Sequence, residues 1–301
     1  MEIRRFAAID IGSNSVRLLI ENVLQNGEAP MFKKSALIRV PVRLGGNAFR
    51  DNVIPEITIR QLVDTMIGFK HIMRANNVLH YKGCATSAMR EAANGAQIIK
   101  RIKKEAGIDI EIISGNSEAH IIFNSQKAVR EKMAKNCVFA DVGGGSTEIT
   151  VFKNGKVWAA KSFRIGTIRL LQKTVAESEW KKMKEWVHTK TLRMREVSMI
   201  GSGGNINRIS KMAQLKTDKP LTFTKLNEII EELKTYSFDD RIKKFDLNPD
   251  RADVIVPAGE IFITLMQWLK AEKIFIPKVG LGDGIVREVF KEYLDGKKST
   301  L

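Results

Sequence analysis

Two aspartates each stand at the start of a turn rich in glycine and serine. Asp10 opens Asp-Ile-Gly-Ser-Asn-Ser and Asp141 opens Asp-Val-Gly-Gly-Gly-Ser, and each follows a short apolar run typical of a strand. Glycine lets the backbone approach phosphate oxygens closely with its N–H groups, and serine hydroxyls add further donors. A carboxylate beside such a turn would repel phosphate unless it holds a hard cation such as Mg²⁺. The pattern therefore predicts phosphate chemistry with a divalent metal, and Glu148, seven residues after Asp141, could serve the same ion.

The two aspartate turns belong to an internal repeat. In each copy a strand enters the turn, a second strand leaves it, and an Asn-Gly pair, Asn26-Gly27 or Asn154-Gly155, predicts a hairpin to a third strand. Asp10 and Asp141 are 131 residues apart, about one domain length in a chain of 301 residues. We therefore expect two homologous halves, residues 1–124 and 125–301, whose turns could face each other.

Helices are expected between these strands. The spacing of apolar residues predicts helices over 57–76, 91–106, 116–135, 177–195, 224–234, 251–270 and 285–294, and strands over 81–86, 109–113, 197–200 and 273–276. The helix over 116–135 is expected to join the two halves, with the boundary near Asn124. Strands alternating with helices indicate an α/β fold.

The charge of the chain favours a polyanionic partner. Lysine and arginine number 50 against 34 acidic residues, a formal net charge of +16, and residues 161–216 hold 13 basic and 4 acidic side chains. This stretch is read equally well as an anion-binding surface or as one solvated helix face formed by Lys181, Lys182, Lys184, Lys190, Arg193 and Arg195. Aromatic residues interleave poorly with the basic ones, which argues against a base-stacking nucleic-acid surface.

Other features narrow the class of protein. The most apolar window, 254–269, is interrupted by a proline and two polar residues and is shorter than the ~20 residues that a membrane helix needs, so no membrane span is expected. The N-terminus lacks the apolar core of a signal peptide, which favours a cytoplasmic location. Cys84 and Cys137 form no CxxC and are expected to be buried thiols, and the scattered histidines do not have metal-ligand spacing.

Seven motifs extend this pattern over nearly the whole chain. They are Asp10-Ile-Gly-Ser-Asn-Ser-Val-Arg-Leu18, Ala85-Thr-Ser-Ala-Met-Arg-Glu-Ala92, Ile113-Ser-Gly-Asn-Ser-Glu-Ala119, Asp141-Val-Gly-Gly-Gly-Ser-Thr-Glu148, Gly201-Ser-Gly-Gly-Asn205, Arg251-Ala-Asp-Val254 and Gly282-Asp-Gly-Ile285. In content and order they resemble the exopolyphosphatase / guanosine pentaphosphate phosphohydrolase family, in its short two-domain form. The resemblance implies two ribonuclease-H-like domains of the actin, Hsp70 and sugar-kinase superfold, flanking an active-site cleft.

The resemblance also implies roles for individual residues. Glu118 matches the glutamate that positions and deprotonates the attacking water, and Arg90 is a candidate charge clamp. Asp141 matches the metal-binding aspartate, with Asp10 and Glu148 as supports and Mg²⁺ or Mn²⁺ as the ion. The implied phosphate-contacting residues are Gly12, Ser13, Asn14, Ser15, Gly143, Gly144, Gly145, Ser146, Thr147, Gly203 and Gly204. The family often carries a second glutamate where this chain has Ser117, so Ser117 is given no catalytic role.

The leading hypothesis is Mg²⁺-dependent hydrolysis of the terminal phosphate of linear inorganic polyphosphate by base-activated water. Hydrolysis of the 5′-terminal phosphate of guanosine pentaphosphate needs the same chemistry, and the net charge favours the longer polyanion. A kinase of the same superfold, a noncatalytic polyphosphate or alarmone sensor and an actin-like assembly protein are further alternatives. Glu118 argues against the kinase, and retention of Glu118, Asp141 and Glu148 argues against a pure sensor. Sedimentation with nucleotide would detect the filaments of an assembly protein. A homodimer is a common arrangement for such proteins.

Overall fold

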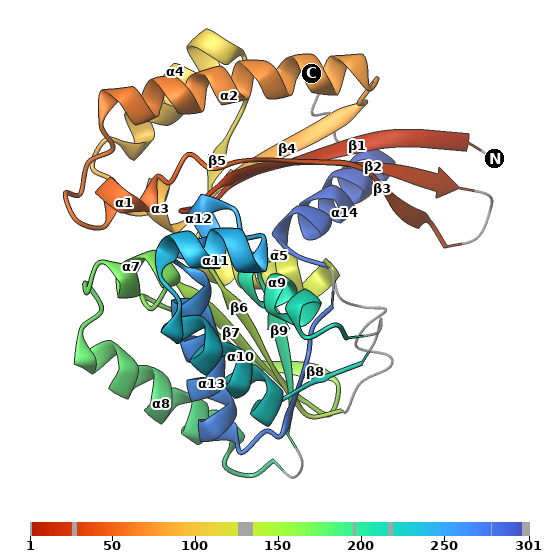
Figure 1. The fold of residues 1–301 in the computed structure, drawn as a ribbon. Coiled ribbons are helices and arrows are strands. Elements are labelled where there is room, and N and C mark those ends of the chain that lie inside the picture. The colour runs from red at the N-terminus through yellow and green to blue at the C-terminus, as the bar shows by residue number, and fades with distance from the viewer. Residues whose placement is uncertain are drawn as a thin grey trace. The chain divides into compact units, whose positions relative to one another are not determined.

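The chain folds into two compact units. The computed structural model describes residues 2–25, 29–125, 135–194, 197–215, 219–277 and 279–296. One unit consists of Met1–Ser125 together with Val279–Leu301, and the other of Gln126–Lys278. Each unit is built on one mixed sheet with helices packed against it (Figure 1).

The sheet of the first unit has the strand order β3-β2-β1-β4-β5. Its strands are β1 (Glu2–Ile11), β2 (Val16–Gln25), β3 (Met31–Val40), β4 (His80–Ala85) and β5 (Glu111–Ile112). β1 pairs antiparallel with β2 and parallel with β4. The short turn after Asp10 allows only the antiparallel pairing, whereas β4 is reached through a long helical crossover, as parallel strands require.

Helices cover both faces of this sheet. They are α1 (Gly45–Ala48), α2 (Glu56–Ala75), α3 (Ser87–Glu91), α4 (Gly95–Ala106), α5 (Gly115–Ser125) and α14 (Leu281–Leu294). The apolar stripes of α2 and α4 pack against one face, where Leu62 and Ile102 share a core with Ile9 and Leu18. On the other face α14 lies along the strands (Figure 1). This arrangement buries both the inward-facing and the outward-facing residues of β1 from Phe6 to Ile11.

The position of α14 differs from the sequence expectation, which assigned all of 125–301 to one domain. Phe290 of α14 packs edge-on against Phe6 of β1, with ring centroids 5.4 Å apart, and against Phe32 of β3 at 5.6 Å. The last helix therefore completes the first unit, which is discontinuous in sequence. Apolar periodicity predicts that this segment is helical, but it does not say which sheet buries its apolar face.

The second unit repeats the topology of the first and extends it. Its sheet has the order β10-β11-β9-β6-β7-β8, so β6 pairs antiparallel with β7 and parallel with β9, as β1 does with β2 and β4. This correspondence confirms the internal repeat. The strands are β6 (Cys137–Val142), β7 (Thr147–Lys153), β8 (Lys156–Phe163), β9 (Ser198–Ser202), β10 (Leu221–Thr222) and β11 (Lys273–Phe275). The helices are α7 (Thr167–Leu171), α8 (Glu177–Thr191), α9 (Gly204–Met212), α10 (Phe223–Thr235), α11 (Phe238–Phe245), α12 (Pro249–Ala252) and α13 (Ile255–Leu269).

Helix α13 forms the centre of the second core. By length and composition the segment Pro249–Leu269 could pass as a membrane span, but 61% of its most apolar window is buried inside the protein. Phe262 and Leu265 pack there with residues of the sheet, α8 and α10, and this packing accounts for the apolar composition. Pro257 lies in the first turn of α13. Backbone N–H groups in a first turn have no partner within the helix, so proline, which lacks this group, costs no helical hydrogen bond there.

Several sequence expectations have a defined outcome. Cys84 and Cys137 are buried and form no disulfide, as predicted, and burial raises the pKa of the Cys84 thiol to about 12. The predicted helix over 116–135 corresponds to α5 in its described part, and residues 126–134 lie outside the described residues, as do Asn26 and Gly27. The predicted helix over 91–106 begins later, as α4 at Gly95, because α3 ends at Glu91 and Ala92 adopts an extended conformation.

Candidate active site

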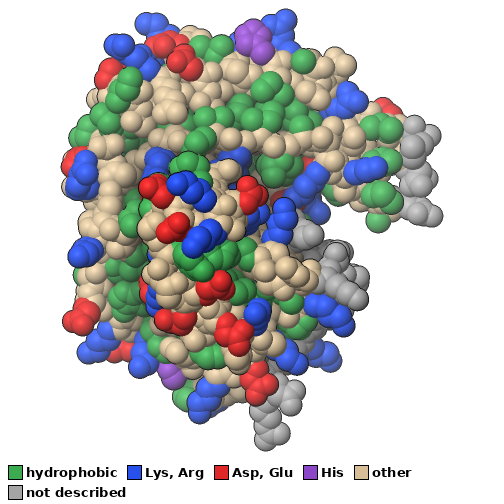
Figure 2. All heavy atoms as spheres, viewed as in Figure 1, with side chains coloured by type: hydrophobic (Ala, Val, Ile, Leu, Met, Phe, Trp, Pro, Cys, Tyr) green, Lys and Arg blue, Asp and Glu red, His purple; other side chains and the backbone are tan. Residues whose placement is uncertain are grey.

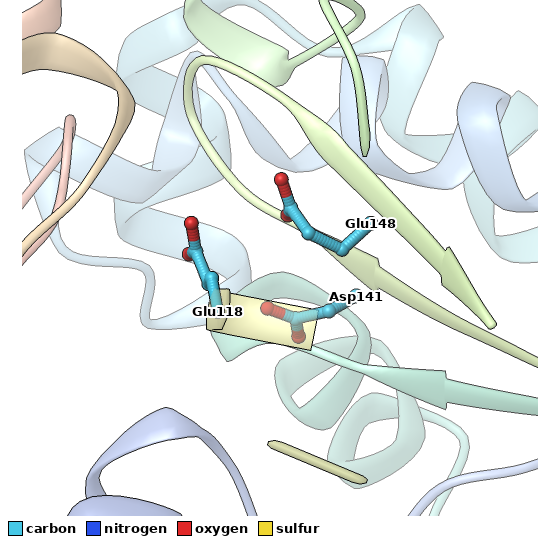
Figure 3. A group of neighbouring side chains, drawn as sticks. All are labelled: Glu118, Asp141 and Glu148. Atoms are coloured by element: carbon cyan, nitrogen blue, oxygen red, sulfur yellow. The ribbon is translucent and has the colours of Figure 1, made fainter. Parts of the chain in front are cut away.

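Asp141 and Glu148 lie opposite each other in the sheet of the second unit. They are cross-strand partners in the antiparallel pair of β6 and β7, so their side chains project from the same face. One oxygen of each carboxylate lies within 4.8 Å of the other (Figure 3). Glu148 is 1% exposed. Two carboxylates this close repel each other unless a cation or a proton lies between them, and their oxygen atoms are the donors that Mg²⁺ and Mn²⁺ prefer. The pair therefore fits the predicted metal.

The face that carries this pair is opposite to the main core of the unit. Ala140, Val142 and Ile149, the chain neighbours of Asp141 and Glu148, point into the hydrophobic core with α8 and α13. Because side chains alternate along a strand, the two carboxylates project away from that core. The two carboxylates therefore lie on one surface of the sheet, while the apolar residues on the opposite surface pack into the core.

The turn after Asp141 presents a row of backbone donors. Gly143 N–H donates to the carbonyl of Ser146 at 2.9 Å, which closes the turn. The carbonyls of Gly143 and Gly144 accept from the N–H groups of Thr167 and Ile168 at 3.0 and 2.9 Å. The carbonyl of Gly145 accepts from Arg169 Nε at 2.7 Å. In a trans peptide the N–H points opposite to the C=O, so the N–H groups of residues 144, 145 and 146 point away from α7, as in an anion-binding nest.

The start of α7 braces this turn closely. A Cβ on Gly166 would lie 2.5 Å from the carbonyl oxygen of Gly144, so only glycine fits there without displacing the turn. Thr147, predicted to contact phosphate, donates its hydroxyl to the carbonyl of Ile165 at 2.6 Å. Its hydroxyl proton is used inside the unit, and the structure gives Thr147 a role in fixing the turn.

The turn after Asp10 in the first unit is built in the same way. Gly12 N–H donates to the carbonyl of Ser15 at 3.2 Å, and the carbonyls of Ser13 and Asn14 accept from residues 45 and 43 at 2.8 and 3.1 Å. The N–H groups of Asn14 and Ser15 therefore point away from that brace. Ser13 Oγ lies 2.8 Å from Ser87 Oγ, and the Ser15 hydroxyl has no hydrogen-bond partner among the residues that the structure describes.

Asp10 has a different partner from Asp141. Its cross-strand neighbour is Arg17, and Arg17 Nη1 lies 3.5 Å from Asp10 Oδ2. Arg17 occupies the position that Glu148 holds in the second copy. Sequence reasoning did not single out Arg17, although counting seven residues from the aspartate in both copies would have found it. The predicted metal role of Asp10 stays a prediction, and its charge is balanced by an arginine in the structure.

A third glycine turn leads into α9 beside Asp141. Gly203 has φ +121°, and a Cβ there would lie 2.9 Å from the carbonyl oxygen of Val142 and 3.7 Å from Asp141 Oδ1. Glycine is therefore required, and the N-terminus of α9 begins next to the carboxylate. The first N–H groups of a helix lack partners within the helix and favour anions, in agreement with the predicted phosphate role of Gly203 and Gly204.

Glu118 and Arg90 belong to the first unit. Glu118, also labelled in Figure 3, lies in the first turn of α5 and is buried. Ser114 caps this helix, because its Oγ accepts from Ser117 N–H at 3.0 Å. Arg90 Nη1 donates to the carbonyl of Ile113 at 2.6 Å, just before the cap. The structure thus shows Arg90 bracing the segment that presents Glu118, and its role as a charge clamp remains a prediction.

Helix α8, which carries Lys181, Lys182, Lys184 and Lys190 of the basic stretch, lies on the other face of the second sheet from the carboxylate pair. Met183 and Val187 of α8 pack into the core that contains Ile149 and Val151, whereas Asp141 and Glu148 project from the opposite face. The lysines of α8 therefore do not flank the carboxylates within this unit, and Arg195 lies outside the described residues. Lys and Arg side chains on the face drawn in Figure 2 are interspersed with Asp and Glu. Lys181, Lys182 and Lys184 are exposed, which agrees with the reading of α8 as a solvated helix face.

Two units of the same topology, each with an aspartate followed by a phosphate-type turn, define the actin-like class of α/β proteins. A structure of an exopolyphosphatase from Cytophaga hutchinsonii matches with a TM-score of 0.81 and 25% identity, over 98% of this chain and 99% of that one. The sequence model of the Ppx/GppA phosphatase family matches residues 29–292 of this chain. The chain belongs to the Ppx/GppA phosphatase family.

Three relatives show the range of functions within this similarity. A bifunctional 3-dehydroquinate synthase/phosphatase of Fusobacterium nucleatum is 27% identical over 90% of this chain and 44% of its own length. Exopolyphosphatase 1 of Mycobacterium tuberculosis is 23% identical over 97% of this chain and 90% of its own length. A guanosine-5′-triphosphate,3′-diphosphate pyrophosphatase of Vibrio cholerae is 22% identical over 95% and 59%. The chain thus spans about half the length of the first and third of these proteins.

Proposed function

We propose that the protein is an exopolyphosphatase that releases the terminal phosphate of linear inorganic polyphosphate with Mg²⁺ or Mn²⁺. The observation that carries the proposal is the pair of Asp141 and Glu148 beside three backbone N–H groups that point away from α7. Carboxylate oxygens suit a hard cation, and adjacent N–H donors suit phosphate oxygens. The family to which the chain belongs is a family of phosphatases.

The carboxylates and the backbone N–H groups of the site have separate roles in the proposed reaction. Asp141 and Glu148 would hold the Mg²⁺, which when bound would neutralise charge on the phosphate oxygens. The N–H groups of residues 144 to 146 bind and orient the terminal phosphate. Glu118 of the first unit accepts a proton from water as the water oxygen bonds to phosphorus. The bridging P–O bond breaks, and the shortened chain leaves with the bond's electrons.

Guanosine pentaphosphate is the alternative substrate, in line with the Vibrio cholerae relative. Both substrates offer a terminal phosphate to the same groups, so the proposed chemistry does not separate them. The net charge of +16 favours the longer polyanion. The kinase and sensor hypotheses are supported less well, because each leaves the water-activating role of Glu118 without use.

The test is phosphate release measured side by side from short polyphosphate, long polyphosphate, guanosine pentaphosphate and ATP, with and without Mg²⁺. We expect release from polyphosphate that depends on Mg²⁺ and exceeds release from guanosine pentaphosphate, with little from ATP. A preference for guanosine pentaphosphate would establish the alternative. Tight binding of polyphosphate without any release of phosphate would contradict the enzyme hypothesis and support the sensor hypothesis.

A further inference from the structure

Ser162 is the third member of a row of polar residues that crosses three neighbouring strands. Asp141 on β6 faces Glu148 on β7, and Glu148 in turn faces Ser162 on β8. Cross-strand partners project from the same face, so the three side chains stand in line. Ser162 lies 14 positions beyond Glu148 in the sequence and belongs to none of the motifs that indicate phosphate chemistry.

The serine hydroxyl contacts the carboxylate directly. Ser162 Oγ donates a hydrogen bond to Glu148 Oε1 at 2.8 Å. A glutamate side chain has three rotatable torsions, and fixing one oxygen restricts the last of them. A carboxylate offers about four acceptor sites, so one bond from Ser162 leaves capacity for a cation on the side of Asp141.

We propose that Ser162 is a positioning residue of the metal site, holding the Glu148 carboxylate in the orientation that binds a divalent cation together with Asp141. This inference rests on the proposed function, in which Asp141 and Glu148 hold the metal. Groups that hydrogen-bond to metal ligands lower the entropy lost on binding and orient the ligand atoms, and their removal typically costs about 10- to 100-fold in metal affinity. Ser162 itself is not expected to touch the metal or the substrate.

The experiment measures Mn²⁺ binding to the full chain without substrate, by the loss of the free-Mn²⁺ signal in electron paramagnetic resonance. Ser162→Ala should raise the dissociation constant about 10- to 100-fold. Ser162→Thr, which keeps the hydroxyl on a strand that tolerates β-branched residues, should restore the affinity to near that of the unmodified protein. Ser178→Ala, at an exposed serine of α8, is the matched control and should bind as the unmodified protein does.

Turnover separates positioning from a general loss of structure. In Ser162→Ala the Mn²⁺ concentration for half-maximal phosphate release should rise while the rate at saturating Mn²⁺ stays close to that of the unmodified protein. If the alanine variant does not fold, Ser162→Cys replaces it, and its weaker donor should give an intermediate affinity.

The outcomes distinguish this inference from the proposed function. If Asp141→Asn loses Mn²⁺ binding but Ser162→Ala does not, the role of Ser162 is wrong and the metal site stands. Equal weakening by alanine and threonine would show that the hydroxyl is not responsible and would also overturn the inference. If the unmodified protein binds no Mn²⁺, both the metal site and the role of Ser162 are wrong. The same holds if the Asp141→Asn variant binds Mn²⁺ as tightly as the unmodified protein.

Discussion

Arg17 neutralises Asp10 across strands β1 and β2, at the place in the first unit where the second unit sets Glu148 against Asp141. The two copies of the repeat share their turn and their strand register, and they differ in the charge of this one cross-strand neighbour. An aspartate beside an arginine needs no other cation, whereas two facing carboxylates do. The repeat therefore keeps the acidic metal-type pair in the second copy and a balanced ion pair in the first.

This difference predicts unequal effects of two matched substitutions. Asp141→Asn should raise the Mg²⁺ concentration needed for half-maximal phosphate release by about 10-fold or more, because a hard cation loses a charged oxygen ligand. Asp10→Asn should change it much less, since the Asp10 charge is already balanced. Mg²⁺ titrations of phosphate release for both variants provide the measurement. Full activity in EDTA, or equal shifts for the two variants, would contradict the prediction.

Glu118 is expected to be required for turnover and dispensable for binding. Glu118→Gln keeps the size of the side chain but cannot accept the proton of water, so the rate should fall by about 10²- to 10⁴-fold. The turns after Asp10 and Asp141 are unchanged, and polyphosphate should still be retained on a filter with the protein. A variant with nearly normal phosphate release would show that another carboxylate is the base, and Glu148→Gln would be tested next.

The brace behind the second turn is expected to be essential. Gly166→Ala places a methyl group 2.5 Å from the Gly144 carbonyl oxygen, so the turn must shift and its N–H groups lose their alignment. We expect phosphate release to fall at least 10-fold, because a displacement of about 1 Å at a positioned site can cost 100-fold.

The control is Gly68→Ala in α2, where a Cβ meets nothing within 4 Å. It should stabilise the protein by roughly 0.5–1 kcal/mol, because alanine favours a helix over glycine. Activity and thermal unfolding of both variants give the comparison. A fully active Gly166→Ala would show that α7 does not set the turn.

Glu21 is expected to make stability depend on pH. It is 2% exposed on β2, and burial, with the nearby charge of Asp283, raises its pKa to about 7. Lys34 and Arg287 face the same group and oppose this rise. Asp283 accepts from Gly280 N–H at 2.8 Å and pairs with Lys34 at 2.8 Å, which ties the start of α14 to β3.

The sign follows from the higher pKa in the folded state. The folded protein binds the Glu21 proton more tightly than the unfolded chain, so the contribution of Glu21 to stability is greatest below pH 4.5 and falls as the pH rises to about 7. The loss is on the order of 3 kcal/mol. Glu21→Gln should remove most of this dependence and be the more stable protein at pH 8 in urea unfolding. Glu185→Gln, at an exposed glutamate of α8, should keep the original dependence, and an unchanged slope for Glu21→Gln would disprove the assignment.

Local sequence determined much of this molecule. Aspartate followed by glycine and serine between two apolar runs fixes a tight turn between antiparallel strands, and its repetition 131 residues later predicts two similar α/β units. The apolar spacing over 116–135 predicts a helix with Glu118 in its first turn. These features depend on residues close together in the chain, so their types and spacing suffice to predict them.

Tertiary structure decided which residues of distant segments share a core or a site, because that depends on which helix faces and strands pack together. The periodicity of the last helix does not specify that Phe290 packs on Phe6 of the first unit. The composition of α8 does not specify that its core side chains occupy the sheet face opposite to Asp141. The contact of Ser162 with Glu148 depends on the register of β7 against β8, which a slip of one residue would abolish by moving Ser162 to the other face. Register and burial are set by the packing of the whole unit, so only the folded chain shows which polar groups share a site.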